Sequence, residues 1–151
     1  MSNLDAFLHA IAVSEGTAGV GDRGYNVIVG SRPGRAILFR SYKDHPRVLV
    51  ELSASLSSTA AGRYQILERY ADAYRASLNL PDFSPASQDA IATQMIRERG
   101  ALPDIEAGRF DAAVGRCSNL WASLPGAQYQ QRTNLMSDLR AAYAAAGGSL
   151  A

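Results

Sequence analysis

Apolar residues near the start of the chain follow the spacing of a helix with one face in a core. The apolar positions, at i, i+3, i+4, i+7 and i+8, are Leu4, Phe7, Leu8, Ile11 and Ala12. This stripe predicts a helix from about Ser2 to Ser14. Gly16 follows it, and glycine commonly ends helices.

The pattern changes after Gly16, where glycines become frequent and short β-branched runs replace the helical spacing. Glycine-rich sequence of this kind is typical of turns and loops. Three runs predict short strands, at residues 24–30, 36–39 and 48–50.

From Ala60 onward the spacing is helical again. It predicts a helix that Pro81 ends, and a second that starts at Ser84-Pro85 and stops at Gly100. Shorter helices are expected at about 103–107 and 109–120, and a last one up to Ala146. Segregated strands and helices indicate the α+β class. We therefore expect one domain over residues 1–151, with an N-terminal helix (about 2–15), a β-containing lobe (about 16–58) and a helical lobe (about 59–147).

Glu15 is the acid that this pattern singles out. It lies seven residues after Leu8, on the apolar stripe and in the last helical turn. Burial and the negative end of the helix dipole both disfavour a carboxylate there, which raises its pKa. A general acid that works near neutral pH needs such a pKa. The alternative is a solvated glutamate at a frayed helix end.

Charge and cysteine content narrow the function classes. The formal net charge of +1 gives no overall attraction to nucleic acid or to a membrane surface. One stretch is locally basic, from Arg32 to Arg47, and is either a solvated loop face or a contact for an anionic polymer. The single cysteine, Cys117, excludes an intrachain disulfide and is expected in the core.

Targeting and metal signals are missing from the sequence. The first residues show no basic region followed by an apolar run, so we expect no export signal, and no apolar run is long enough for stable membrane insertion. His9 and His45 are the only histidines, and no Cys/His spacing suits zinc. We expect no metal and no cofactor.

Two polar and aromatic sets suit a sugar ligand, because sugar rings have apolar faces edged by hydroxyl groups. One lies at the expected start of a helix and includes Tyr64 and Gln65, and the other is the segment around Tyr129. A core tyrosine and an ordinary loop are the alternatives. Gln94, in mid-helix, is either solvent-exposed or part of a ligand groove.

Motifs over nearly the whole chain carry a resemblance to a known family. In order they are Ser14-Glu15-Gly16-Thr17, residues 24–30, Asp44-His45-Pro46-Arg47, Ser58-Thr59, and residues 61–65, 82–85, 87–90, 98–103, 116–119 and 121–127. On these motifs the chain resembles the phage lambda endolysin family, which are lytic transglycosylases of the lysozyme superfamily.

The resemblance implies a lysozyme-like fold of two lobes with a cleft between them, and Glu15 as the catalytic acid. It implies substrate-binding residues along a saccharide groove, namely Tyr25, Ser58, Tyr64, Gln65, Gln94 and Tyr129. The implied reaction cleaves the β-1,4 bond between N-acetylmuramic acid and N-acetylglucosamine in peptidoglycan and leaves 1,6-anhydro-muramoyl ends. The implied protein is a monomer made in the host cytoplasm that reaches the periplasmic wall through a holin and lyses the cell.

Two other functions stay open at this point. Asp22, Asp44 and Glu51 lie in the β region, so Asp22 or Glu51 would serve a hydrolytic muramidase as a second carboxylate. The other is a wall-binding protein that has the fold without the activity.

Overall fold

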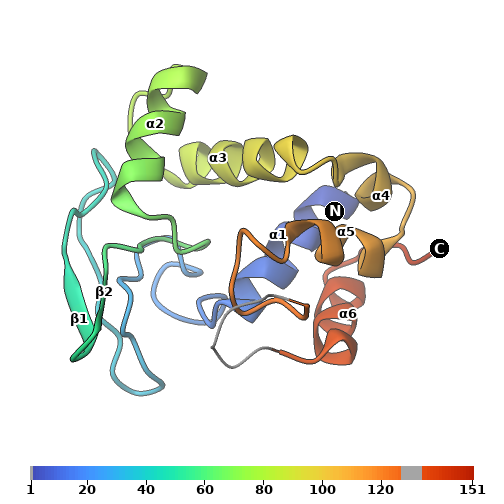
Figure 1. Ribbon diagram of the computed structural model, residues 1–151, viewed down its shortest axis with the longest axis horizontal. Helices are drawn as coiled ribbons and strands as arrows, with labels where there is room; N and C mark the ends of the chain where they lie inside the picture. The colour runs from blue at the N-terminus through green and yellow to red at the C-terminus, as the bar shows by residue number, and fades with distance from the viewer. Residues whose placement is uncertain (1, 127–133) are drawn as a thin grey trace. The chain divides into compact units, whose positions relative to one another are not determined.

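The computed structural model describes residues 2–126 and 134–151 (Figure 1). The chain forms two compact units. Unit 1 comprises Met1–Gly16 and Ala92–Ala151, and unit 2 comprises Thr17–Ile91. The division falls within one helix, α3 (Pro85–Glu98). Helices dominate unit 1 and short strands occur in unit 2, which confirms the α+β class.

Helix α1 (Asn3–Ser14) confirms the N-terminal prediction. Its first turn carries a reciprocal cap, in which Ser2 Oγ accepts from the Asp5 backbone N–H at 3.1 Å and the Asp5 carboxylate accepts from the Ser2 backbone N–H. Phe7 and Ile11 on its apolar stripe are almost completely buried. The apolar spacing in the sequence therefore marks the core face of this helix.

The rest of unit 1 packs around α1. Helices α4 (Leu102–Glu106) and α6 (Met136–Ala145) both lie against α1, and α5 (Phe110–Cys117) contacts α4 and α6. The Phe110 ring contacts the Phe7 ring at a centroid distance of 5.7 Å and the Tyr143 ring at 4.7 Å. Cys117 is fully buried, as predicted, and burial raises the pKa of its thiol to about 12.

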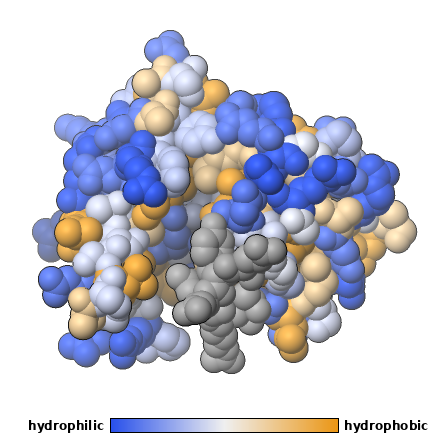
Figure 2. All heavy atoms as spheres, in the orientation of Figure 1, coloured by the Kyte–Doolittle hydropathy of each residue, from blue (hydrophilic) through white to orange (hydrophobic). Residues whose placement is uncertain are grey.

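Unit 2 contains little regular β-structure. β1 (Val50–Ser53) pairs antiparallel with β2 (Leu56–Ser58), with Val50 opposite Ser58 and an irregularity between Glu51 and Ser53. Leu49, Leu52 and Leu56 in and beside this hairpin are exposed, and isolated hydrophobic residues stand among hydrophilic ones on the face drawn in Figure 2.

The predicted strands at residues 24–30 and 36–39 are wrong. The first forms only isolated bridges, from Val27 to Leu38 and from Ile28 to Ala61, and the Leu38 bridge is all that the second run contributes. Gly24 and Gly30 both adopt positive φ angles, which turn the chain at each end of the first run. The run at 48–50 is a strand only from Val50 onward.

The helix predicted from Ala60 also starts too early. Helix α2 spans Glu68–Leu78 and ends at Asn79, which has a left-handed backbone. Gly62 and Gln65 take φ angles of +83° and +49°, which an α-helix does not allow. Ala61 and Ile66 instead exchange backbone hydrogen bonds across a tight turn. The set containing Tyr64 and Gln65 therefore lies on this turn.

A buried amide holds the turn in unit 2. Gln88 is fully buried, and its Nε2 donates to the carbonyl oxygens of Tyr25 and Phe83 at 3.0 and 2.9 Å. Its Oε1 accepts from the Arg63 backbone N–H at 3.0 Å. A Cβ at Gly62 would lie only 2.3 Å from this oxygen. Glycine at 62 is required both by the backbone angle and by this contact.

No helix among residues 2–126 and 134–151 is long and apolar enough to cross a bilayer.

Candidate active site

Glu15 stands at the C-terminal end of α1, in the capping position. Its backbone N–H still donates to Ile11 O at 2.9 Å, and Gly16 then turns the chain away with φ +76°. The residue is half-buried. The structure thus places the acid where the stripe predicted it, fixed by a regular helix rather than by a loop.

A hydroxyl group holds the Glu15 carboxyl. Ser123 Oγ donates to Glu15 Oε2 at 2.7 Å. Ser14 Oγ lies 2.8 Å from Ser123 Oγ, and Asn134 Nδ2 donates to Ser14 Oγ at 3.1 Å. All four residues belong to unit 1.

Burial raises the pKa of Glu15 from 4.5 to about 7, and the hydrogen bond from Ser123 opposes part of that rise. A carboxyl with this pKa is present in comparable acid and base forms near neutral pH, so it can give a proton and take one back. The electrostatics support the general-acid role expected from the sequence.

Tyr25 and Tyr64 are brought together in unit 2 by one carboxylate. Tyr64 Oη donates to Asp89 Oδ1 at 2.6 Å, and Tyr25 Oη donates to the same oxygen at 2.9 Å. Their rings meet edge to face at 6.4 Å, and the Arg63 guanidinium lies over the Tyr25 ring at 5.2 Å. Burial and Asp89 raise the pKa of both phenols, which stay protonated. Tyr64 is almost completely buried.

The remaining predicted groove residues lie on separate elements. Gln65 Nε2 donates to Gly62 O at 2.8 Å. Gln94 lies in the part of α3 that belongs to unit 1, where its Nε2 donates to Glu98. Ser58 ends β2, and its Oγ accepts from the Ala60 backbone N–H at 3.1 Å. Tyr129 lies outside the described residues.

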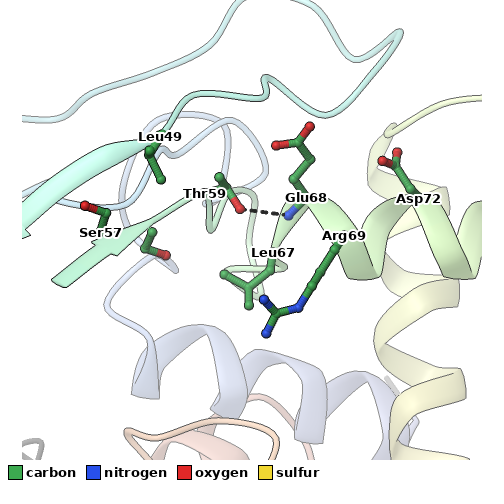
Figure 3. A pocket seen from close by; sticks show the side chains of 8 residues that line it. Leu49, Ser57, Thr59, Leu67, Glu68, Arg69 and Asp72 are labelled. Atoms are coloured by element: carbon green, nitrogen blue, oxygen red, sulfur yellow. Dashed lines mark hydrogen bonds between the residues drawn. The ribbon is translucent and has the colours of Figure 1, made fainter.

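A pocket of about 490 Å³ lies on the surface of unit 2, beside Ser58. Figure 3 shows its lining, which combines apolar side chains with hydroxyl and charged groups; the residues are Leu49, Ser57, Ser58, Thr59, Leu67, Glu68, Arg69 and Asp72. Thr59 Oγ1 accepts from the Glu68 backbone N–H at 3.0 Å, so this hydroxyl also caps α2. A mixed lining of this kind suits a sugar ring.

The other acidic candidates differ from Glu15 in their surroundings. Asp22 is half-exposed and accepts from Tyr42 Oη at 2.7 Å, and Glu51 lies exposed on β1. Asp44 accepts from Arg47 Nε at 2.7 Å and from Arg75 at 2.6 Å, and chiefly the Arg47 contact lowers its pKa to about 2.

Within the basic stretch, Arg47 lies in an acidic cluster formed by Asp44, Glu68 and Asp72. Besides Asp44, it donates to Glu68 at 2.8 Å and to Asp72. The backbone N–H of Arg47 also donates to Nδ1 of buried His45, whose Nε2 bonds Ile66 O at 2.9 Å. Because a carbonyl only accepts, Nε2 carries the proton and His45 is neutral and structural.

No group of three or more His, Cys, Asp or Glu side chains suited to a metal ion occurs in the described part of the chain. Sequence reasoning missed the residues that position others. Ser123 and Asn134 are 108 and 120 residues from their partners on α1, and Asp89 is 64 residues from Tyr25. No local spacing marks such pairs.

Comparison with known proteins extends over almost the whole chain. The endolysin family model matches residues 5–150. The endolysin of Escherichia phage lambda is 52% identical over 149 residues, covering 96% of this chain and 91% of that protein. The endolysin of Escherichia phage P2 is 49% identical over 154 residues, covering 97% and 93%.

Solved structures agree with the sequence comparison. Bacteriophage lambda lysozyme complexed with a chitohexasaccharide matches with a TM-score of 0.93 and 51% identity, covering all of this chain and 98% of that chain. A second structure, lysozyme from bacteriophage lambda, matches with a TM-score of 0.89 and 50% identity over the same shares.

Proposed function

Because this chain belongs to the endolysin family and has a lysozyme-like fold, we propose that it is a lytic transglycosylase in which Glu15 acts alone as acid and base. The substrate is the β-1,4 bond between N-acetylmuramic acid and N-acetylglucosamine in peptidoglycan. One observation carries the proposal: burial raises the pKa of Glu15 to about 7, and an uncharged hydroxyl is its hydrogen-bond donor.

The two chemical roles follow from that pKa. Protonated Glu15 gives its proton to the glycosidic oxygen as the bond from that oxygen to the muramoyl anomeric carbon breaks. The resulting carboxylate, poorly solvated and therefore a stronger base, takes the proton of the muramoyl 6-hydroxyl. The 6-oxygen closes onto the anomeric carbon. Glu15 ends protonated, the product carries a 1,6-anhydro end, and no water is consumed.

The carboxylates of unit 2 differ in whether they could assist Glu15 as a second acid. Asp44, with a pKa of about 2, stays ionised, and its charge is paired with Arg47 and Arg75, so it does not serve as a second acid. A hydrolytic muramidase would instead recruit Asp22 or Glu51 to position water, and these carboxylates are exposed enough to do so.

Sugar binding is proposed along the residues that the family resemblance marks. Ser58 lies at the pocket of unit 2, where Leu49 and Leu67 offer apolar surface and Thr59 a hydroxyl. Gln65 offers an amide on a fixed turn, and Gln94 and Tyr129 are further proposed contacts. Tyr25 and Tyr64 were expected to bind the sugar themselves; because both phenols donate to Asp89 and Tyr64 is almost completely buried, we propose that this pair instead supports the sugar-binding residues of unit 2.

The lambda structure complexed with a chitohexasaccharide supports a glycan as the ligand. We place the action of the protein at the bacterial cell wall, as its family implies. Release through a holin lesion, action as a monomer and independence from nucleic acid are parts of the same proposal.

Product analysis tests the proposal directly. Muropeptides released from purified Gram-negative peptidoglycan are separated and weighed by mass spectrometry. Anhydro ends are lighter by one water than hydrolysed ends. We expect anhydro ends from the wild-type protein, and for Glu15→Gln a loss of cleavage of at least about 100-fold with the fold intact. Hydrolysed ends would establish the muramidase, and no cleavage by a folded wild-type protein would leave a wall-binding protein.

A further inference from the structure

A chain of hydrogen bonds leads from the loop before α6 to the Glu15 carboxyl. Asn134 Nδ2 lies 3.0 Å from Ser14 O, 3.1 Å from Ser14 Oγ and 3.3 Å from Ser123 O. The Asn134 backbone N–H also donates to Ser123 O at 2.9 Å. Asn134 thereby ties the end of α1 to the Ser123 turn within unit 1.

The direction of each hydrogen bond in this series follows from which atoms can donate and which can only accept. Ser14 O and Ser123 O are carbonyl oxygens, so the Asn134 atom beside them is the amide nitrogen, which only donates. Ser14 Oγ therefore accepts from Asn134, and because the one Ser123 hydroxyl proton goes to Glu15 Oε2, Ser14 Oγ is the donor to Ser123 Oγ, 2.8 Å away. Ser123 in turn directs its proton to Glu15 Oε2.

We propose that Ser123, held by Ser14 and Asn134, is a positioning residue for Glu15 that makes Oε2 the permanent acceptor and leaves Oε1 as the oxygen that gives and retakes the catalytic proton. This proposal rests on the transglycosylase function proposed above. It adds which carboxyl oxygen reacts and which residues determine that choice.

The arrangement serves both forms of Glu15 without rearrangement. In the acid form, Oε2 is the carbonyl oxygen and accepts from Ser123. In the carboxylate form, the same donor stabilises the negative charge, and a donor fixed in advance needs no reorganisation when that charge develops. An uncharged donor also leaves the pKa near neutrality, whereas the arginine partners of Asp44 lower its pKa to about 2.

The charged groups on α4 and α6, the helices packed against α1, are either paired with other residues or exposed. Asp104 on α4 accepts from Arg109 and Arg116 at 2.7 Å each, and Arg140 on α6 donates to Asp111. The Tyr143 hydroxyl donates to Ser149 O at 2.9 Å. Glu106 and Asp138 on the same two helices are exposed. Burial and Ser123 are the two causes that shift the pKa of Glu15.

The test compares Ser123→Ala with Ser123→Thr, which keeps the hydroxyl, and with Ser118→Ala, a matched control on the same unit whose Oγ donates to Gly115 O. The Glu15 carboxyl is titrated by carbon-13 NMR, which needs no activity. Initial rates on peptidoglycan give kcat and KM against pH. Thermal unfolding confirms that each variant folds.

For Ser123→Ala we expect the pKa of Glu15 to rise by about one unit, since a donor to the carboxylate is lost. The alkaline limb of kcat/KM should move up by the same amount. At pH 7 kcat should fall about tenfold with KM unchanged, because Ser123 orients the acid and does not bind the sugar. Ser123→Thr should restore most of both effects. Ser14→Ala, which keeps the donor but loosens it, should give a smaller shift of the same sign.

An unchanged pKa in Ser123→Ala would overturn the proposal, and so would a shifted pKa with unchanged kcat. A rise in KM without a fall in kcat would show that Ser123 contacts substrate instead. Failure of the proposed function looks different: the wild-type products would lack anhydro ends, while the NMR shift in Ser123→Ala would still be seen.

Discussion

Two carboxylates, Glu15 in unit 1 and Asp44 in unit 2, have opposite surroundings. In unit 1, Glu15 sits at the end of a packed helix with a serine hydroxyl as donor, and its pKa rises to about 7. In unit 2, Asp44 sits among Arg47 and Arg75, and its pKa falls to about 2. The difference shows that the donor's charge, as well as burial, decides whether an acid titrates near neutral pH or stays ionised there.

The units also differ in how their backbones are fixed. Unit 1 relies on the capping box and the apolar faces of α1 and its neighbouring helices. Unit 2 relies on turns with positive φ angles and on the buried amide of Gln88. Single substitutions that remove one of these devices test the contrast.

The largest effect on stability is expected from Gly62→Ala in unit 2. A Cβ there meets Gln88 Oε1 at 2.3 Å, and φ is +83°. Strain of the backbone and displacement of the amide should lower the free energy of unfolding by about 2–4 kcal/mol. Chemical denaturation measures it. Gly19→Ala is the matched control in the same unit, because nothing lies within 4 Å of its Cβ position and it should change stability little. Equal effects in the two variants would contradict this account of the turn.

A smaller effect, dependent on pH, is expected from Glu15→Gln in unit 1. The folded pKa of about 7 lies above the unfolded value of 4.5, so the contribution of Glu15 to stability is fully present below pH 4.5 and is lost as pH rises through 7. The glutamine variant stays neutral and avoids this loss. Between pH 5 and pH 8 it should gain about 1–3 kcal/mol relative to wild type.

Thermal unfolding at several pH values measures that gain. The control is Glu106→Gln on α4, whose side chain is exposed and should show no such trend. A wild-type stability that is flat from pH 5 to pH 8 would mean that the Glu15 carboxyl is not desolvated.

The smallest effect is expected from Arg47→Met in unit 2. The folded pKa of Asp44, about 2, lies below its ordinary 3.8, so the cluster adds stability above pH 3.8 that is lost as pH falls to about 2. The variant should therefore lose less stability than wild type over this window. Because these side chains are 34–48% exposed, the difference should be slight and should shrink in high salt. Acid unfolding at low and high ionic strength measures it; a difference that grows with salt would contradict it.

The sequence predicted regular elements far better than turns. The stripe of α1 and the Ser84-Pro85 start of α3 depend on neighbouring residues, so local spacing was sufficient. The segment containing Gly62 and Gln65 also has helical spacing at its C-terminal side, yet its conformation depends on Gln88, more than twenty residues away. A periodic pattern carries no information on such a contact.

The candidate site also contains residues that local sequence predicts and residues that depend on distant contacts. Glu15 could be predicted as a candidate because the apolar stripe of its own helix places it toward the core. Ser123 lies in one of the motifs that carry the resemblance but was given no role, and Asn134 was missed, because local spacing does not show which distant residue either side chain contacts. Only the folded chain brings them beside Ser14 and Glu15.

The burial of Cys117 matters for transfer from the cytoplasm to the cell wall, which the proposed function requires. The chain has one thiol, which is fully buried and has a pKa of about 12. Almost no reactive thiolate forms at physiological pH, and a buried sulfur is closed to oxidants and to mixed-disulfide exchange. A protein built this way passes from reducing to oxidising surroundings with its covalent structure unchanged, and needs neither an oxidase to mature it nor a reductase to rescue it.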